Sequence, residues 1–227
     1  MTSMTLISGP LSMFGAKAHI AILEKGLTAN LVMVPFTMDH RYEPKHAQVL
    51  RINPKRQVPV LIHGELEIFD STQIFEYLEH LQPDPPLWPT HPVARARARL
   101  LELRADEVFF PPVIRLMSLQ QRLGEAGAQE AIAQLLRYYV EMDALLQGRD
   151  FLAEQFSYAD IALFMAQVFA ARMGAPMGSA TPRLLAWRER LIMRPAVNQV
   201  VRQFAGALAM YKLQIPDFIA RYTAGPE

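Results

Sequence analysis

The stretch that decides the fold is Asn53-Pro54-Lys55-Arg56-Gln57-Val58-Pro59-Val60-Leu61, which is followed by Asp70-Ser71-Thr72-Gln73-Ile74-Phe75-Glu76-Tyr77-Leu78. Pro59 interrupts an apolar run. A proline cannot donate a hydrogen bond to a sheet ladder, so within a strand it marks an edge, a bulge or a cis peptide bond. The tight turn at 63–64 and the apolar run at 66–69 predict a β-hairpin. Apolar residues at helical spacing then predict a helix from Asp70 onward.

The chain before the hairpin predicts a β-α-β unit. The short apolar run at 5–7 predicts a strand. The composition of 15–25 is helical, and Gly26 is well placed to end that helix. A β-branched run at 31–34 predicts the next strand, and a crossover of this kind normally joins parallel strands. With a short helix expected over 45–51, the order is β-α-β followed by β-β-α.

Helices alone are expected in the rest of the chain. Prolines crowd the stretch 82–92, which is typical of a stiff linker between domains. Alternating arginines at 95–99 are compatible with a strand, but the leucines and alanines around them favour a helix. Pro111-Pro112 must end or kink that helix. The other predicted helices cover 128–146 and 157–170, begin near 181 and near 194, and occupy 205–222.

The composition excludes several kinds of site. The chain of 227 residues has no cysteine, which excludes disulfides, thiolate metal sites and cysteine nucleophiles. The histidines show no metal-binding spacing, so no metal is expected. The formal net charge of +1 gives no electrostatic reason to expect a nucleic acid partner. No apolar run is long enough to span a membrane, and residues 1–10 lack the basic start of a signal peptide, so we expect a cytoplasmic protein.

One helix start in the second half of the chain carries its own physical signature. Ser157 is a good N-cap, and Asp160 lies at the third helical position, so each side chain can satisfy a free backbone N–H. Phe156 and Ile161 occupy the positions of a hydrophobic staple. We therefore assign a structural role, and no catalysis, to Asp160.

These motifs together resemble the glutathione S-transferase family. The stretches 53–61 and 70–78 resemble its pattern of asparagine-proline, valine-proline, acid-serine and a helix ending in tyrosine-leucine. Residues 17–27 resemble the first helix of the family, and 156–162 resemble its C-terminal folding motif. The resemblance covers essentially the whole chain.

The resemblance implies an α/β plus all-α protein. We expect a thioredoxin-like βαβ-ββα glutathione-binding domain over 1–82, a proline-rich linker over 83–91 and an all-helical bundle over 92–227. It also implies glutathione as co-substrate, a homodimer, and attack by the glutathione thiolate on a hydrophobic electrophile.

Candidate glutathione contacts follow from the same motifs. Val58, before Pro59, resembles the position whose backbone pairs with the cysteinyl part of glutathione. The helix start at Ser71 attracts anions and would hold the γ-glutamyl carboxylate, and Asp70 could pair with its ammonium. Capping of that helix is at least as good an explanation from the residues alone. Gln57, and less strongly Lys45, are candidates for the glycyl carboxylate.

Ser12 is the candidate for stabilising the thiolate. Family members place a Tyr, Ser or Cys just after the first strand. This loop has no tyrosine and the chain has no cysteine, whereas Ser12 lies five residues before Lys17, as in theta-like members of serine type. Helix capping by Ser12 is the competing interpretation, and the two roles are compatible.

The resemblance also suggests where the electrophile binds. The predicted hydrophobic pocket consists of Phe14, Phe110, Ile114 and Met117, although core packing explains any one of them as well. Met13 and Asp70 depart from the residues usual in the family. These departures keep open an alternative function, a non-catalytic binding or interaction module with the same fold.

Overall fold

The computed structural model describes residues 3–119 and 122–223. The chain forms two compact units. The sheet unit combines Met1–Pro85 with Pro195–Glu227, and the helical unit is Pro86–Arg194. The last segment of the chain thus belongs to the same compact unit as the first.

The sheet unit is built on four strands in the order β2-β1-β3-β4. They are β1 (Met4–Ser8), β2 (Asn30–Met33), β3 (Val60–His63) and β4 (Leu66–Phe69). The pair β1–β2 is parallel, and the pairs β1–β3 and β3–β4 are antiparallel. The β-α-β unit and the β-hairpin predicted from the sequence are therefore confirmed.

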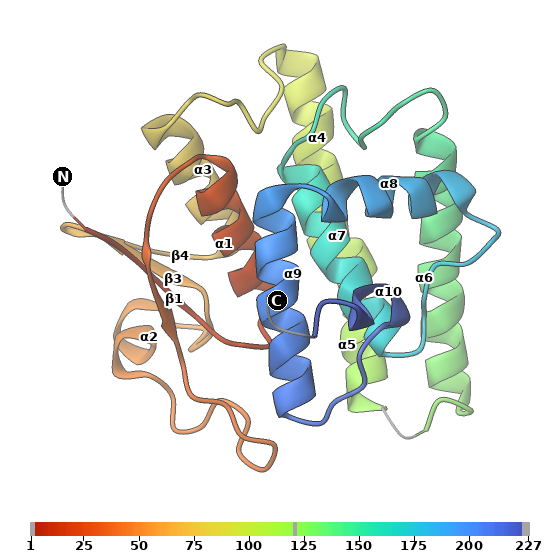
Figure 1. The fold of residues 1–227 in the computed structure, drawn as a ribbon, viewed down its shortest axis with the longest axis horizontal. Coiled ribbons are helices and arrows are strands. Elements are labelled where there is room, and N and C mark those ends of the chain that lie inside the picture. The colour runs from red at the N-terminus through yellow and green to blue at the C-terminus, as the bar shows by residue number, and fades with distance from the viewer. Residues whose placement is uncertain (1–2, 120–121, 224–227) are drawn as a thin grey trace. The chain divides into compact units, whose positions relative to one another are not determined.

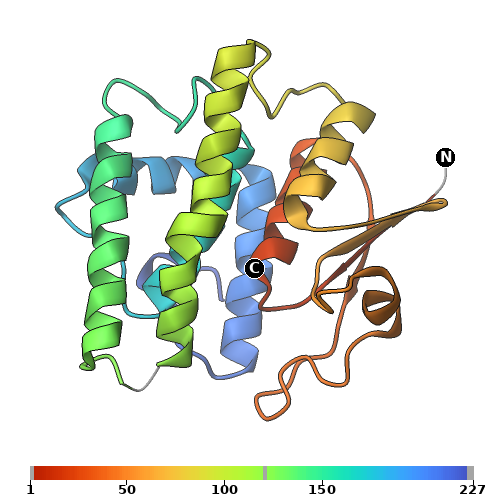
Figure 2. The same cartoon turned by 180° about the vertical axis from the view of Figure 1, so that it is seen from behind.

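Five helices complete the described part of the sheet unit: α1 (Met13–Glu24), α2 (Ala47–Ile52), α3 (Ser71–Leu81), α9 (Pro195–Met210) and α10 (Asp217–Ala220). Helix α1 packs against both α3 and α9, and both views show α9 alongside α1 (Figures 1 and 2). A core cluster of Ile7, Val34, Val49 and Val60 joins the sheet to α2. Gly26 has a φ of 64° and ends α1, as predicted.

The helical unit contains α4 (Pro92–Arg104), the π-helical turn η1 (Ala105–Phe109), α5 (Phe110–Ser118), α6 (Ala126–Leu145), α7 (Tyr158–Arg172) and α8 (Pro182–Ile192). All residues of α7 are buried, and this helix packs against α4, η1, α5 and α8. The capping box at Ser157 and Asp160 is present at the start of α7, as predicted. No helix in the described ranges is both long and apolar enough to cross a membrane.

The paired prolines 111–112 do not end the first helix of the helical unit. The π-helical turn η1 directly precedes α5, whose first turn contains both prolines. Prolines are tolerated in the first turn of a helix because the N–H groups there have no intrahelical acceptor. The widened turn therefore lets the chain remain helical from 92 to 118.

The helix predicted over 205–222 is wrong beyond Met210. The chain turns after α9, and only the short α10 follows. Lys212 lies in the left-handed region with φ 53°, and Pro216 precedes α10. A left-handed residue is the usual way in which a helix ends, so the amphipathic pattern could not continue through this point.

Candidate functional site

Strand register brings the candidate residues to one end of the sheet. Ile7 of β1 pairs with Val60 of β3, and Val60 pairs with Phe69 of β4. The end of β1, the start of β3 and the end of β4 are therefore adjacent. The segments that continue from these three points carry Ser12, the dipeptide 58–59 and the dipeptide 70–71, which the sequence had indicated separately.

Ser12 caps α1. Its backbone is extended, and its Oγ accepts a hydrogen bond from the N–H of Gly15 at 3.0 Å. A hydroxyl group has two lone pairs and one proton, so the capping bond leaves the proton available to another acceptor. The side chain is half-buried, and it stands at a helix N-terminus that favours negative charge. The geometry thus accommodates both roles that the sequence allowed.

Asp70 and Ser71 form the start of α3. The Asp70 carboxylate accepts from the N–H groups of Thr72 and Gln73, at 3.0 and 3.3 Å. Its φ of 75° is unusual for a residue with a side chain and marks a strained backbone, of the kind that concentrates at functional sites. Ser71 is buried. Asp70 is only half-buried, so the carboxylate that caps the helix is still accessible to a ligand.

The Asn53 side chain holds the loop before β3 with two hydrogen bonds to its backbone. Asn53 is buried, its Nδ2 donates to the carbonyl of Gln57 at 2.6 Å, and its Oδ1 accepts from the N–H of Lys55 at 2.9 Å. Gln57 is exposed, and the peptide bond between Val58 and Pro59 is cis. Among the described residues, no backbone hydrogen bond outside the helices and strands involves Val58. A ligand backbone therefore has a free edge to pair with.

The other candidates have surroundings of their own. Lys45 pairs with Glu43 at 3.2 Å in the loop before α2. Lys17 places its ammonium 5.3 Å from the centre of the half-buried Phe14 ring, within the sheet unit. The remaining three belong to the helical unit, where Phe110 is buried against Phe169, Ile114 is exposed and Met117 is half-buried. The pocket predicted from these four residues stays a prediction.

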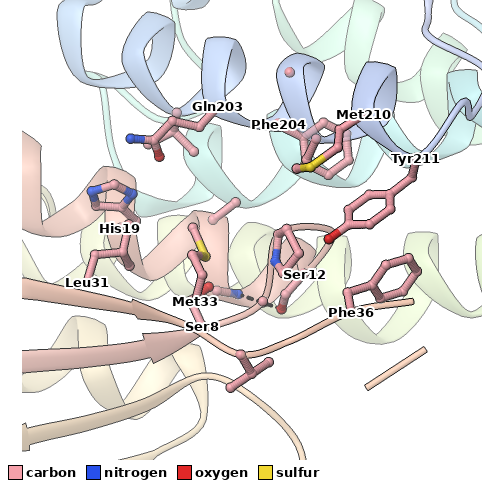
Figure 3. A pocket seen from close by; sticks show the side chains of 18 of the residues that line it. Ser8, Ser12, His19, Leu31, Met33, Phe36, Gln203, Phe204, Met210 and Tyr211 are labelled. Carbon is pink, nitrogen blue, oxygen red and sulfur yellow. Dashed lines mark hydrogen bonds between the residues drawn. The ribbon is translucent and has the colours of Figure 1, made fainter. Parts of the chain in front are cut away.

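A cavity of about 540 Å³ adjoins Ser12 inside the sheet unit. It is bounded by the loop that leads into α1, by α1 itself, by β2 and the residues after it, and by α9 (Figure 3). The apolar side chains that surround it include Met33, Phe36, Phe204 and Met210. A lining of aromatic and methionine side chains suits an apolar ligand of adaptable shape.

The polar groups of this cavity are few and uncharged. The polar side chains that line it are Ser8, Ser12, His19, Gln203 and Tyr211, and none of its lining residues is Asp, Glu, Lys or Arg. Burial lowers the pKa of His19, so its imidazole is neutral at physiological pH. The cavity therefore offers hydrogen bonds without a net charge, and it favours an uncharged ligand.

The contribution of α9 to this cavity could not be predicted from the sequence. The periodic apolar residues of this helix, among them Val200 and Phe204, indicate a buried face but not the segment that covers it. Tyr211 stands at the end of the helix, where the sequence predicted only more helix. No group of His, Asp or Glu in the described ranges is arranged to hold a metal ion.

Comparison with known proteins finds the same family in both halves of the chain. Residues 6–86 match the glutathione S-transferase N-terminal domain family, and residues 107–195 match the glutathione S-transferase C-terminal domain family. The theta class glutathione S-transferase from Xanthomonas axonopodis pv. citri, solved with glutathione bound, superposes with a TM-score of 0.73 at 25% identity, covering 88% of this chain and 97% of that one.

Curated relatives include proteins with two kinds of name. A Stringent starvation protein A homolog from Coxiella burnetii is 37% identical over 47% of this chain and 48% of its own length, so the match spans about half of each protein. A glutathione S-transferase from Arabidopsis thaliana is 29% identical over 84% of this chain and 85% of its own. The two domain matches, the four-stranded sheet with its helices and the likeness to solved transferases together show that this chain belongs to the glutathione S-transferase family.

Proposed function

We propose that this protein is a glutathione transferase that stabilises the glutathione thiolate with Ser12 for attack on a hydrophobic electrophile. One observation carries the proposal. The Ser12 hydroxyl caps α1 on the wall of an uncharged, largely apolar cavity, at the end of the sheet where the 58–59 and 70–71 dipeptides also lie.

Glutathione would bind along the free backbone edge at Val58. Its cysteinyl part pairs with that residue, its γ-glutamyl carboxylate lies at the start of α3 beside Ser71, and its ammonium pairs with Asp70. Gln57 and Lys45 serve the glycyl end. Two observations support this arrangement: Asp70 is half-buried, and among the described residues no backbone hydrogen bond outside the helices and strands involves Val58. The likeness to a transferase solved with glutathione supports the identity of the ligand.

The chemical demand on Ser12 is modest. A free thiol has a pKa of about 8.5, so a small fraction is ionised at neutral pH. Lowering that pKa by about two units requires roughly 2.7 kcal/mol of thiolate stabilisation. One hydrogen bond to a charged acceptor contributes about 1.5–3 kcal/mol, and a helix N-terminus adds to it. Ser12 on α1 combines both.

The test separates catalysis from helix capping at the same residue. Ser12→Ala removes the hydroxyl and the cap, whereas Ser12→Gly removes the hydroxyl at a cost of only a few tenths of a kcal/mol in helix capping. We expect glutathione to bind one per subunit in a calorimetric titration. Conjugation of an activated aryl chloride should fall at least about tenfold in both variants. Full activity in Ser12→Gly would show that Ser12 acts only as a cap.

A second candidate function is a non-catalytic binding module with the same fold. The observation that favours it is the 37% identity, across 47% of the chain, to a relative that does not bear a transferase name. This function predicts glutathione binding, or no binding, without turnover of any electrophile. For either function we propose a cytoplasmic homodimer, which sedimentation of the purified chain would test.

A further inference from the structure

Two buried charged side chains join the ends of α1 and α3. Lys25 is the C-cap of α1, and Glu79 lies in the last turn of α3. The Lys25 ammonium lies 2.5 Å from the Glu79 carboxylate, and the two side chains are 0% and 8% exposed. Taking two charges out of water costs about as much as their attraction returns, so a buried ion pair is weak evidence for stability. The pair therefore calls for another explanation, and its place in the sheet unit supplies one.

The Lys25 ammonium has an acceptor for each of its three N–H groups. Besides the contact with Glu79, it donates to the carbonyl of Pro85 at 2.7 Å and to that of Pro83 at 3.4 Å. These carbonyls belong to the start of the proline-rich stretch that leaves α3. A cation at the C-terminal end of a helix also interacts favourably with the helix dipole. Lys25 therefore holds the end of α1, the end of α3 and the chain that follows α3 in one place.

A second lysine joins the same two helices closer to their starts. The Lys17 ammonium lies 5.3 Å from the centre of the Phe14 ring, on α1, and 5.4 Å from that of the Phe75 ring, on α3. Lys17 and Phe75 are both fully buried, and a cation over an aromatic face is attracted to the ring. Helices α1 and α3 are in contact, and both views show them side by side (Figures 1 and 2). Cations thus connect the two helices at two levels.

The opposite ends of these helices carry two parts of the proposed glutathione site. Helix α1 starts after Ser12, and α3 starts at Ser71. The register of β1, β3 and β4 brings both starts to the same end of the sheet. Helix α1 has 12 residues and is therefore a rod of about 18 Å. A contact that fixes the far ends of two packed rods also sets the spacing of their near ends.

We propose that Lys25, acting through Glu79, is a positioning residue that sets the spacing between Ser12 and Ser71. The inference rests on the proposed function, because these two residues would hold the thiolate and the γ-glutamyl carboxylate of the same glutathione molecule. A displacement of about 1 Å at a reacting group can lower a rate about a hundredfold. Charged hydrogen bonds have a defined length and direction, so they hold such a spacing more closely than apolar side chains do. This gives a reason for burying a lysine and a glutamate at this point.

The test replaces the ion pair with apolar side chains instead of breaking it. Lys25→Met alone leaves the Glu79 carboxylate buried without its cation, which is strongly destabilising. Lys25→Met combined with Glu79→Leu turns the pair into two apolar side chains, a change that is often neutral for stability. The matched control is Arg115→Gln combined with Glu130→Gln, which removes an exposed ion pair of the helical unit.

Two ligands distinguish positioning from a general structural role. Glutathione would contact both helix starts, whereas γ-glutamyl-α-aminobutyryl-glycine has a methyl group in place of the thiol and lacks the group that Ser12 would bind. In calorimetric titrations the Lys25→Met/Glu79→Leu variant should bind glutathione about tenfold more weakly, because the hydrogen bond to the thiolate is lost. Its affinity for the analogue should stay within about twofold. The control variant should bind both ligands as the unchanged protein does.

The outcomes separate this inference from the proposed function. Unless glutathione lost more affinity than the analogue, the role of Lys25 would be refuted and the proposed transferase left intact. If the unchanged protein bound neither ligand, the proposed function would fail, and hydrogen exchange would then decide. The N–H groups of Gly15 and Thr72, at the starts of α1 and α3, should exchange several-fold faster in the Lys25→Met/Glu79→Leu variant than in the control at equal global stability. Equal exchange would refute the inference.

Discussion

The indole N–H of Trp187 donates a hydrogen bond to the carboxylate of Asp160 at 2.8 Å, and both side chains are fully buried. The same carboxylate accepts from the N–H of Leu152 at 2.9 Å, from the N–H of Ser157 at 2.9 Å and from the Ser157 hydroxyl at 3.1 Å. One side chain therefore joins the loop before α7, the start of α7 and the middle of α8. This explains structurally why an acidic residue occupies this position.

Replacing Asp160 with asparagine should destabilise the protein by about 1–3 kcal/mol at neutral pH. The amide fills the same space, but its NH₂ group faces donors and leaves at least one of them without an acceptor. Chemical denaturation monitored by Trp fluorescence or circular dichroism would measure the loss. Asp39→Asn, on an exposed loop residue, is the matched control and should change stability by less than about 0.5 kcal/mol. Equal stability of the two variants would contradict the structural role of Asp160.

The same carboxylate should give stability a particular pH dependence. Burial raises the pKa of Asp160 to about 6 from 3.8, although its hydrogen bonds lower it in part. Between these values the folded protein holds a proton that the unfolded chain has lost, so a rise in pH favours unfolding. The stability difference between the unchanged protein and Asp160→Asn should therefore shrink as the pH rises from 3.8 to 6, and then stay level. A difference that grows with pH would show that the donors outweigh burial.

Local signals in the sequence predicted the sheet and most helix starts correctly. The capping box at Ser157 and the stop at Gly26 each depend on a few neighbouring residues, so local chemistry decides them. Ser12, Val58 and Ser71 could likewise be proposed because family motifs mark them. Their gathering at one end of the sheet follows only from the register of three strands.

The cavity could not be predicted because its walls come from distant segments. Phe36 follows β2, whereas Phe204 and Tyr211 lie more than 160 residues further along the chain. An apolar stripe on α9 requires a partner but does not name it. The prediction that Phe14 and residues on α5 line an electrophile pocket used the family pattern, and the structure directs attention to the end of α9 as well.

Gly15 should not tolerate a side chain. A Cβ at this position would lie 2.0 Å from the Oγ of Ser8, which is buried, and 3.2 Å from the Oγ of Ser12. Gly15→Ala should therefore cost about 1–3 kcal/mol and weaken glutathione binding by displacing Ser12. Thermal melting and calorimetric titration would measure the two effects.

Two further variants test whether a steric clash with Ser8 causes the loss of stability in Gly15→Ala. Ser8→Ala combined with Gly15→Ala removes the oxygen that the new methyl group meets and should recover part of the lost stability. Gly206→Ala lies in α9 with no atom near its new Cβ, and it should stabilise by up to about 1 kcal/mol. Loss of stability in Gly206→Ala as large as in Gly15→Ala would refute the steric explanation.

Lys212→Gly should stabilise the turn that positions Tyr211. Lys212 has a φ of 53°, which costs a residue with a side chain about 1 kcal/mol relative to glycine, and its own side chain is exposed. The matched control is Ala209→Gly, an exposed position in the last turn of the same helix, which should destabilise by up to about 1 kcal/mol. The same residue introduced three positions apart should thus change the free energy of unfolding in opposite directions. The measurement is a denaturation curve for each variant. If both curves shifted in the same direction, the left-handed turn at Lys212 would not be what ends α9.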